Sequence, residues 1–306
     1  MKVCFIGSGS IGTRHIKNMF HVCEKNNIFL HADLLRATDS PLSQEIDELI
    51  DHIFYRYEDL PCDYDAIFIA NPTYKHYETL INTLPHTSCF FIEKPVFEHS
   101  KKDITFLSKA EKKYYVACPL RYTSVLLEAS RLVQSERILS ARAISSSYLP
   151  QWRKNVDYRQ TYSAHREQGG GVRMDIIHEW DYLLHLFGLP EQIFSLSGKY
   201  SPLQIDSEDI AVYIAQYSDK LVELHLDYFG RKTQRSLELF TADNEYVFDI
   251  CNAAISCNGH LIKQFHETVN DKYLRELEYF IQIVKDDAVS SNDIWTALNT
   301  IKIADS

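Results

Sequence analysis

The chain has 306 residues, 45% hydrophobic and 24% charged, which is typical of a globular protein long enough for about two domains. Its 32 basic and 42 acidic residues give a net charge of −10 and include no Lys/Arg-rich run, so neither a nucleic acid nor an anionic membrane is an expected partner. The apolar runs are shorter than the roughly 20 residues that cross a bilayer.

Cysteine usage and the N-terminus predict the cellular compartment. The seven cysteines include no C-x-x-C pair, which favours reduced thiols over disulfides or a zinc site. The first apolar run reaches Gly7 too early to be the core of a signal peptide. We therefore expect a cytoplasmic protein without a metal site.

The chain opens with an apolar strand over residues 2–6, a glycine-rich turn and a helix over residues 13–24. The turn has the form G-x-G-x-x-G, the signature of a dinucleotide-binding unit. Gly7 would allow the tight turn, Gly9 the approach of the pyrophosphate, and Gly12 the packing of helix on strand. Ser10 and Ile11 would meet the phosphates, because a helix N-terminus offers free N–H groups and a positive dipole end.

Further strands and helices alternate as far as residue 117. Strands are expected over the ranges 28–35, 66–70, 89–92 and 114–117, with helices from about residue 74 and over residues 100–112. This alternation predicts a doubly wound parallel sheet that binds ligands at the carboxyl ends of its strands. The motifs Asn71-Pro72-Thr73 and Glu93-Lys94-Pro95 both lie at such ends.

The end of the second strand bears on the choice between NAD and NADP. An acidic residue there binds the ribose 2′-hydroxyl, whereas an arginine accommodates a 2′-phosphate. The strand could end at Asp33 or run on to Arg36. We favour Arg36, because Leu34 and Leu35 are typical of a strand interior, and NADP is therefore slightly favoured over NAD.

Four motifs follow one another along the first 190 residues, and in combination they are more specific than any one of them. They are Asn71-Pro72-Thr73 with His76, Glu93-Lys94-Pro95, Cys118-Pro119-Leu120-Arg121-Tyr122, and the stretch from Gly169-Gly170-Gly171 through Asp175 to His178. Together they resemble the glucose–fructose oxidoreductase/inositol dehydrogenase (Gfo/Idh/MocA) family. The stretches 148–152, 157–159 and 178–182 resemble a branch found with surface-polysaccharide and sialic-acid-like sugars.

The resemblance implies two domains. Residues 1–120 would form an α/β Rossmann domain, and residues 121–306 an α+β domain for substrate binding and oligomerisation, with the last helix packed on either domain. The residues expected to bind the cofactor are Gly7, Gly9, Ser10, Ile11, Gly12, Arg36, Asn71, Pro72, His76, Glu93 and Lys94.

One feature departs from the family pattern. The family places Asp and His four residues apart on an active-site helix, whereas here His178 follows Asp175 by three and Glu179 holds the four-residue position. Both spacings keep side chains on one face of a helix. Either His178 or Glu179 could therefore transfer the proton.

The pattern changes from about residue 140. Residues 138–148 alternate as a strand, and helices are expected over 175–187, 271–285 and 292–304. Long strands are expected over 192–199, 209–217, 220–229, 234–241 and 245–250. They predict a large open, mostly antiparallel sheet with helices on one face. The other face is available for a homo-oligomer, a dimer or tetramer, as the resemblance also implies.

Hydride transfer at a secondary alcohol needs a group that takes the hydroxyl proton and a cation that stabilises charge on oxygen. Lys94 is expected to hold the hydroxyl and relay its proton, and His178 to act as general base or acid, because its ordinary pKa lies near neutrality. Asp175 would orient the imidazole or bind a sugar hydroxyl. The alternatives are a surface ion pair for Lys94 and a structural role for His178.

The segment 148–166 is rich in aromatic residues and arginine. Aromatic faces stack on sugar rings and Arg forks bind carboxylates or phosphates, so it indicates either a wall for an anionic sugar or an oligomer contact. The residues expected to bind substrate are Arg121, Tyr122, Trp152, Tyr158, Arg159, Asp175, His178 and Glu179.

Taken together, the sequence predicts an NAD(P)-dependent oxidoreductase acting on a hydroxyl-bearing carbon of a sugar, nucleotide sugar or sugar acid. One alternative is an enzyme that uses bound NAD transiently for net elimination, epimerisation or glycoside cleavage, which co-purified cofactor without net turnover would favour. Another is a non-catalytic dinucleotide sensor, which Lys94, Asp175 and His178 argue against.

Overall fold

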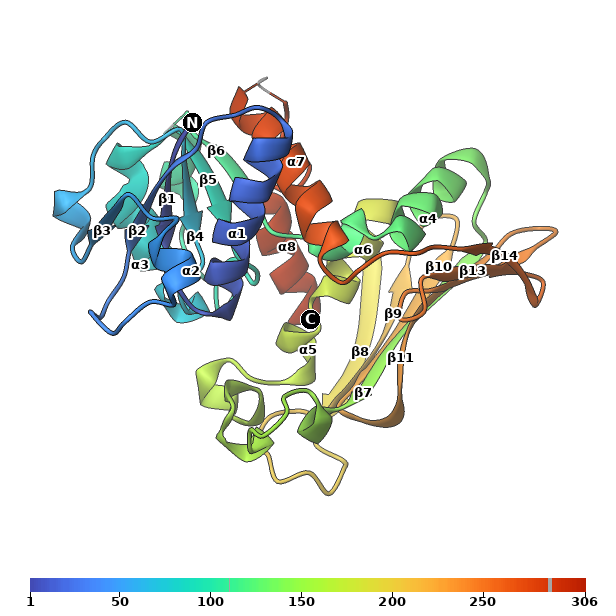
Figure 1. The fold of residues 1–306 in the computed structure, drawn as a ribbon. Helices are drawn as coiled ribbons and strands as arrows, with labels where there is room; N and C mark the ends of the chain where they lie inside the picture. The colour runs from blue at the N-terminus through green and yellow to red at the C-terminus, as the bar shows by residue number, and fades with distance from the viewer. Residues whose placement is uncertain (110, 286–287) are drawn as a thin grey trace. The chain divides into compact units, whose positions relative to one another are not determined.

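The structure, a computed structural model, describes residues 1–109, 111–285 and 288–306. The chain divides into two compact units (Figure 1). The first unit comprises residues 1–119 and 270–299, and the second comprises residues 120–269 and 300–306.

The first unit is built on a parallel sheet with the strand order β3-β2-β1-β4-β5-β6. Its strands are β1 (Lys2–Ile6), β2 (His31–Leu35), β3 (His52–Phe54), β4 (Ala66–Ile69), β5 (Cys89–Ile92) and β6 (Lys113–Val116). Its helices are α1 (Ser10–Lys25), α2 (Gln44–Asp47), α3 (His76–Thr83), α7 (Asp271–Lys285) and the first part of α8 (Ile294–Ala304). This is the strand order of a doubly wound Rossmann sheet, so the expected fold is confirmed.

Helix α7 returns to the first unit from late in the chain and packs beside α1 (Figure 1). Its Phe280 meets the rings of Phe68 and Phe91 edge-on, with centroid distances of 5.3 and 5.1 Å. Those two rings stack on each other at 4.6 Å, on strands β4 and β5. The helix expected over residues 271–285 is confirmed, and it completes the aromatic core of this unit.

The helix expected over residues 100–112 is wrong. The structure has only a 3-10 helix, Thr105–Lys109, and residue 110 lies outside the described residues. The Asp103 carboxylate accepts hydrogen bonds from the backbone N–H and the hydroxyl of Thr105, at 3.0 and 2.7 Å. A side chain that bonds the backbone in this way competes with helix formation.

The second unit is built on a sheet with the order β14-β13-β12-β11-β7-β10-β9-β8, in which only the β7–β10 pair is parallel. Its strands are β7 (Ser140–Tyr148), β8 (Gln192–Gly198), β9 (Ile210–Gln216), β10 (Leu221–Asp227), β11 (Phe229–Phe240), β12 (Glu245–Asp249), β13 (Ala254–Cys257) and β14 (His260–Gln264). Its helices are α4 (Ser124–Ser135), α5 (Val172–Asp175) and α6 (His178–Phe187). The large, mostly antiparallel sheet is confirmed.

The two faces of this sheet differ. Helix α6 covers one face (Figure 1), where Trp180 packs edge-on against Tyr213 of β9 with a centroid distance of 5.2 Å. On the same face Ala143 and Leu224 are fully buried. The opposite face exposes Phe194 and Leu196 of β8, to 61% and 82%. The amphipathic alternation of these strands therefore buries one face and leaves the other open.

The expected helix over residues 175–187 is interrupted. Helix α5 ends at Asp175 and α6 begins at His178. Between them, the N–H of Glu179 donates to the carbonyl of Ile176, a three-residue bond that tightens the turn. Asp175 and His178 therefore lie on two consecutive short helices, and the spacing rule for one continuous helix does not apply to them.

Candidate functional site

The glycine-rich turn joins β1 to α1 in the form that dinucleotide binding needs. Gly7 has a φ of 98°, a conformation that favours glycine. A Cβ on Gly12 would collide with the carbonyl oxygen of Gly7, whereas one on Gly9 would have no atom within 4 Å. The open space is thus at the residue expected to face the pyrophosphate.

Helix α1 starts at Ser10 with its first turn uncapped. Gly9 is the N-cap, no side chain bonds the first turn, and that turn contains no acidic residue. Ser10 is exposed and Ile11 is half-buried. The first N–H groups and the positive dipole end are therefore available to an anion, which fits the pyrophosphate of a dinucleotide.

Strand β2 runs on to Leu35, so Arg36 is the first residue after it. Asp33 lies inside the strand, where it accepts a hydrogen bond from the Tyr64 hydroxyl at 2.7 Å and contacts His52 at 3.1 Å. Arg36 is buried and donates to Ser40, while its Nε has no hydrogen-bond partner among the residues that the structure describes. Of the two residues weighed for the ribose, the structure places Arg36 at the strand end.

The turn after β4 is held by Asn71 and His76. The Asn71 amide donates to Thr79 at 2.7 Å, and its buried Oδ1 has no hydrogen-bond partner. His76 lies between the carbonyls of Asn71 and Val96, at 2.9 and 3.2 Å. Burial lowers the pKa of His76, so its ring is neutral at pH 7 and organises the backbone without adding charge. Pro72, between them, is exposed.

Strand β5 ends in a buried polar pair beside Lys94. The Glu93 carboxylate contacts Nε2 of His15 at 2.6 Å and accepts from the backbone N–H of Lys94 at 3.1 Å. Burial alone would raise the pKa of Glu93, but the hydrogen bond and charge of His15 and the charge of Lys94 lower it below its usual value. Glu93 is therefore ionised and fixes the backbone of Lys94, whose side chain is half-buried.

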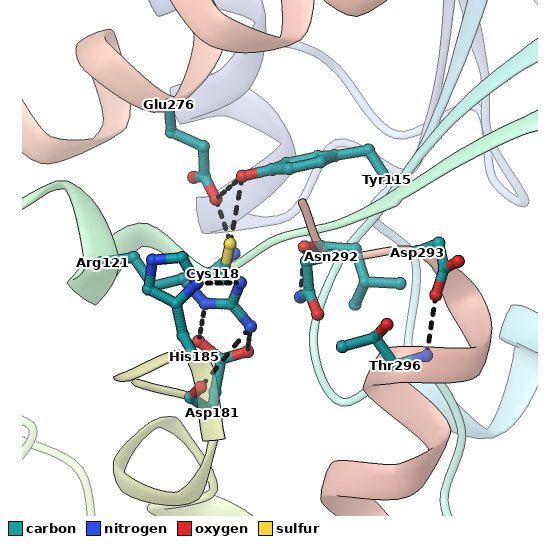
Figure 2. A network of polar contacts seen from close by, with 10 residues as sticks. Tyr115, Cys118, Arg121, Asp181, His185, Glu276, Asn292, Asp293 and Thr296 are labelled. Carbon is teal, nitrogen blue, oxygen red and sulfur yellow. Dashed lines mark hydrogen bonds and ion pairs between the residues drawn. The ribbon is translucent and has the colours of Figure 1, made fainter. Parts of the chain in front are cut away.

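The stretch from Tyr115 to Arg121 contains two networks, one in each unit (Figure 2). In the first unit, the buried carboxylate of Glu276 accepts from the N–H of Cys118 at 2.6 Å and from the Tyr115 hydroxyl at 3.1 Å. In the second unit, the Arg121 guanidinium donates two hydrogen bonds, of 2.8 and 2.7 Å, to the carboxylate of Asp181.

Arg121 was expected to bind substrate, yet only 6% of the residue is exposed. Its Nε and Nη2 both donate hydrogen bonds to the carboxylate of Asp181. Its Nη1 also lies 3.3 Å from His185, whose pKa is lowered by burial and then by the charge of Arg121. The arrangement anchors the start of the second unit to α6. Tyr122, the next residue, is half-buried.

The three residues weighed for proton transfer have different surroundings. Asp175 and His178 are half-buried, and Asp175 accepts a hydrogen bond from the Tyr228 hydroxyl at 2.6 Å. Glu179 is fully buried and forms an ion pair with Arg235 of β11 at 2.8 Å. Burial raises the pKa of Glu179 although Arg235 opposes the shift. Glu179 therefore lies in the core, away from solvent.

The segment 148–166 folds into short turns, and its polar residues are partly engaged. Arg159 binds Asp157 through both carboxylate oxygens and donates to Gln204 at 2.9 Å. The hydroxyl of Tyr158 accepts from the N–H of Gln204 at 3.1 Å. Trp152 is 40% exposed. Of these expected substrate contacts, Arg159 is already neutralised by its neighbour.

The glycines that precede α5 make close contacts with the protein itself. A Cβ on Gly170 would collide with the carbonyl oxygen of Tyr162, and one on Gly171 with the carboxylate of Glu208. The groups that approach these glycines closely are therefore backbone carbonyls and a carboxylate of the same unit. These contacts set the path of the chain into Asp175.

Sequence reasoning missed His15, Arg235 and Tyr228, each of which contacts an expected site residue. His15 had a local signal, because it follows Gly12 by three residues and thus lies one turn along the same helix. Arg235 and Tyr228 had none, since they are 56 and 53 residues away from the partners Glu179 and Asp175.

The comparisons with known proteins identify the first unit. A family model described as "Oxidoreductase family, NAD-binding Rossmann fold", that of Gfo/Idh/MocA, matches residues 1–119. The first unit therefore matches this oxidoreductase family over residues 1–119. The Gfo/Idh/MocA resemblance seen in the sequence motifs is thus confirmed, as is an NAD-binding oxidoreductase. A search of curated proteins found no match.

Solved structures of similar fold extend over nearly the whole chain. A levoglucosan dehydrogenase in complex with NADH and levoglucosan has a TM-score of 0.82 at 15% identity, covering 100% of this chain and 95% of its own. A UDP-N-acetylglucosamine 3-dehydrogenase from Acidithiobacillus ferrooxidans has a TM-score of 0.78 at 16% identity, covering 99% and 95%. An NAD-binding oxidoreductase from Klebsiella pneumoniae has a TM-score of 0.85 at 12% identity, covering 100% and 95%. At these identities the likeness concerns the fold.

Two searches of the described residues complete the description. None of the helices there is both long and apolar enough to cross a membrane. Within the same residues, no group of three or more His, Cys, Asp or Glu side chains is placed to hold a metal ion.

Proposed function

We propose that this chain, whose first unit matches the Gfo/Idh/MocA family, transfers a hydride between NAD(P) and a hydroxyl-bearing carbon of a sugar, nucleotide sugar or sugar acid. The observation that supports it best is the order β1-β4-β5 in the sheet, which puts the glycine turn, Asn71 and Lys94 at the carboxyl ends of three adjacent strands. The sugar dehydrogenases among the proteins of similar fold support the substrate class. In this proposal the first unit binds the dinucleotide and the second the sugar.

The experiment has two parts. Calorimetry of the purified protein with NAD and NADP tests the cofactor site. Absorbance of the reduced cofactor, with panels of free sugars, nucleotide sugars and sugar acids, tests the reaction. Binding of dinucleotide followed by turnover of at least one sugar supports the proposal, and failure to bind either dinucleotide refutes it.

Each polar group has a separate role in this proposal. The bound nicotinamide supplies the hydride acceptor or donor. Lys94 holds the substrate oxygen and relays its proton, and Glu93 supports it by fixing the Lys94 backbone. His178 serves as general base in oxidation and general acid in reduction. Glu179, the other candidate, is enclosed with Arg235, so His178 is the better proton carrier.

The choice of cofactor rests on Arg36. Its position directly after β2 and the unpartnered Nε support binding of the 2′-phosphate of NADP, with Thr38 and Ser40 as further donors. The side chain of Asp33 is already bonded to Tyr64, which argues against a role at the 2′-hydroxyl of NAD. We therefore favour NADP over NAD.

The open face of the large sheet is the proposed oligomer interface. Phe194 and Ile214 pair across β8 and β9 and are 61% and 46% exposed, and the neighbouring Leu196 is 82% exposed. On the same face Arg142 lies between Glu223 and Glu238, at 3.5 and 3.0 Å. A second copy related by twofold symmetry would cover the apolar strip with its own.

Sedimentation of the Leu196→Lys variant tests this interface. A lysine in the apolar strip should convert the dimer or tetramer to monomer. The control is Phe29→Lys in the first unit, which is also exposed, at 75%, lies outside this sheet and should leave the assembly unchanged. A wild-type monomer would refute the interface.

We also propose a cytoplasmic location. Cys62 and Cys251 are exposed thiols that form no disulfide within the described residues, which fits a reducing compartment. Cell fractionation followed by immunodetection tests the location, and recovery of the protein outside the cytoplasm would refute it.

A further inference from the structure

Tyr228 lies between β10 and β11 and is fully buried. Its hydroxyl donates to Oδ2 of Asp175 at 2.6 Å, a short, charge-assisted hydrogen bond. The backbone of Tyr228 is held on both sides, because its N–H donates to Asp209 and its carbonyl accepts from Leu149. The phenol is thus presented to Asp175 by a rigid part of the sheet.

Two residues of the segment 148–166 reinforce this pair. The ring of Trp152 meets that of Tyr228 edge-on, with a centroid distance of 5.2 Å and an angle of 89°. The pKa of Tyr162 is raised by burial and then by the charge of Asp175. The guanidinium of Arg153 lies 5.7 Å from the Tyr162 ring centroid.

Both phenols stay protonated over the working pH range. The pKa of Tyr228 is raised well above its usual value by burial and then by the charge of Asp175, and that of Tyr162 is raised as well. A protonated phenol that faces a carboxylate donates a hydrogen bond to it, and the bond fixes the direction of the carboxylate.

We propose that Tyr228 is a positioning residue that orients Asp175 as the acceptor for a substrate hydroxyl. An ionised carboxylate has two oxygens with about four acceptor sites, so it can bind the Tyr228 hydroxyl and a sugar hydroxyl at once. The inference rests on the proposed function. It assigns Asp175 to substrate binding and leaves proton transfer to His178.

The test compares Tyr228→Phe with a matched variant of another buried tyrosine in the same unit. Tyr213→Phe is the control, because its fully buried hydroxyl donates to the carbonyl of Ala304 at 2.8 Å and not to a carboxylate. Steady-state kinetics are measured on a sugar that the wild type turns over.

For Tyr228→Phe we expect KM for the sugar to rise roughly tenfold, with a smaller change in kcat, since a hydrogen bond to a charged group is lost. Tyr213→Phe should change neither KM nor kcat. The other ionisable groups around the pair are Tyr162, Arg153, Glu208 and Arg173, and all are retained in both variants.

The outcomes separate the inference from the function on which it rests. Wild-type protein that turns over no sugar contradicts the proposed function. A wild type that turns over a sugar, with Tyr228→Phe indistinguishable from Tyr213→Phe in KM and kcat, overturns the role of Tyr228. If both variants lose the same amount of stability and only Tyr228→Phe changes KM, the positioning role of Tyr228 is supported.

Discussion

In the parallel sheet, the residues expected to bind the dinucleotide lie just after strands that are neighbours, so their positions follow from the order of the strands. Gly9, Asn71 and Lys94 come from three short stretches of chain. In the second unit, by contrast, Asp175 accepts a hydrogen bond from Tyr228, which joins β10 to β11 and lies 53 residues further along the chain. In the parallel sheet, each expected site residue is positioned by the end of one strand. In the second unit, the expected site residue is positioned by a partner that lies far away in sequence.

Lys94→Ala gives the largest expected effect and tests the first half of this comparison. Turnover should fall about 10²–10⁴-fold, because a group that handles the hydroxyl proton is lost, while the dissociation constant for the dinucleotide stays the same. Steady-state kinetics and calorimetry measure the two quantities. Lys112→Ala, just before β6, is the control and should retain activity. Full activity of Lys94→Ala would remove this lysine from the mechanism.

Glu179→Gln tests the pairing of distant residues in the second unit, through the free energy of unfolding. The change leaves Arg235 without its buried anion, and removal of one partner of a buried ion pair costs about 3–5 kcal/mol of unfolding free energy. Denaturant unfolding measures the loss. Glu238→Gln breaks an ion pair on the open face of the same sheet and should cost about 0–1 kcal/mol. Equal costs for the two variants would show that Glu179 is not enclosed as described.

Arg36→Asp tests whether the residue that follows β2 determines the preference for NADP over NAD. The variant should lose affinity for NADP by about tenfold or more relative to NAD, since the arginine that meets a 2′-phosphate becomes a repelling anion. Calorimetry with both dinucleotides gives the ratio, and NAD serves as the internal control. An unchanged ratio would mean that another residue meets the ribose.

Glu93→Gln has the smallest expected effect, and it depends on pH. The pKa of Glu93 is lowered in the folded protein, so its contribution is complete above the unfolded pKa of about 4.3 and is lost as the pH falls through the folded pKa. The wild type should therefore be more stable than the variant by about 1–3 kcal/mol at pH 7, with the difference shrinking below about pH 4. Thermal unfolding across this range checks the trend, and a difference that grows at low pH would contradict it.

Much of the fold was predictable because its signals are local. The apolar run over residues 2–6 and the glycine turn give β1 and α1, and the amphipathic period over residues 271–285 gives α7. The failures were local as well: Asp103 bonds the backbone where a helix was expected. The β13–β14 hairpin was missed although Asn258-Gly259, with positive φ at both residues, is a strong two-residue turn signal.

The candidate site divides in the same way. The strand-end residues of the first unit were named from sequence, and Arg36 follows β2 as favoured. The engagement of Arg121 by Asp181, and of Glu179 by Arg235, was not predictable, because each pair spans about 60 residues with no pattern that links the two partners. Contacts of this kind are set by tertiary packing, which single-sequence periodicity does not encode.

The late return of α7 to the first unit has a consequence for synthesis on the ribosome. Phe68 and Phe91 are made early, but Phe280, which covers them, follows only after the intervening second unit, residues 120–269, has been translated. At about 5–20 residues per second, those residues take roughly ten to thirty seconds, during which an apolar surface of the nascent chain stays uncovered. A fragment that ends at residue 119 should therefore bind a hydrophobic dye that the complete chain does not.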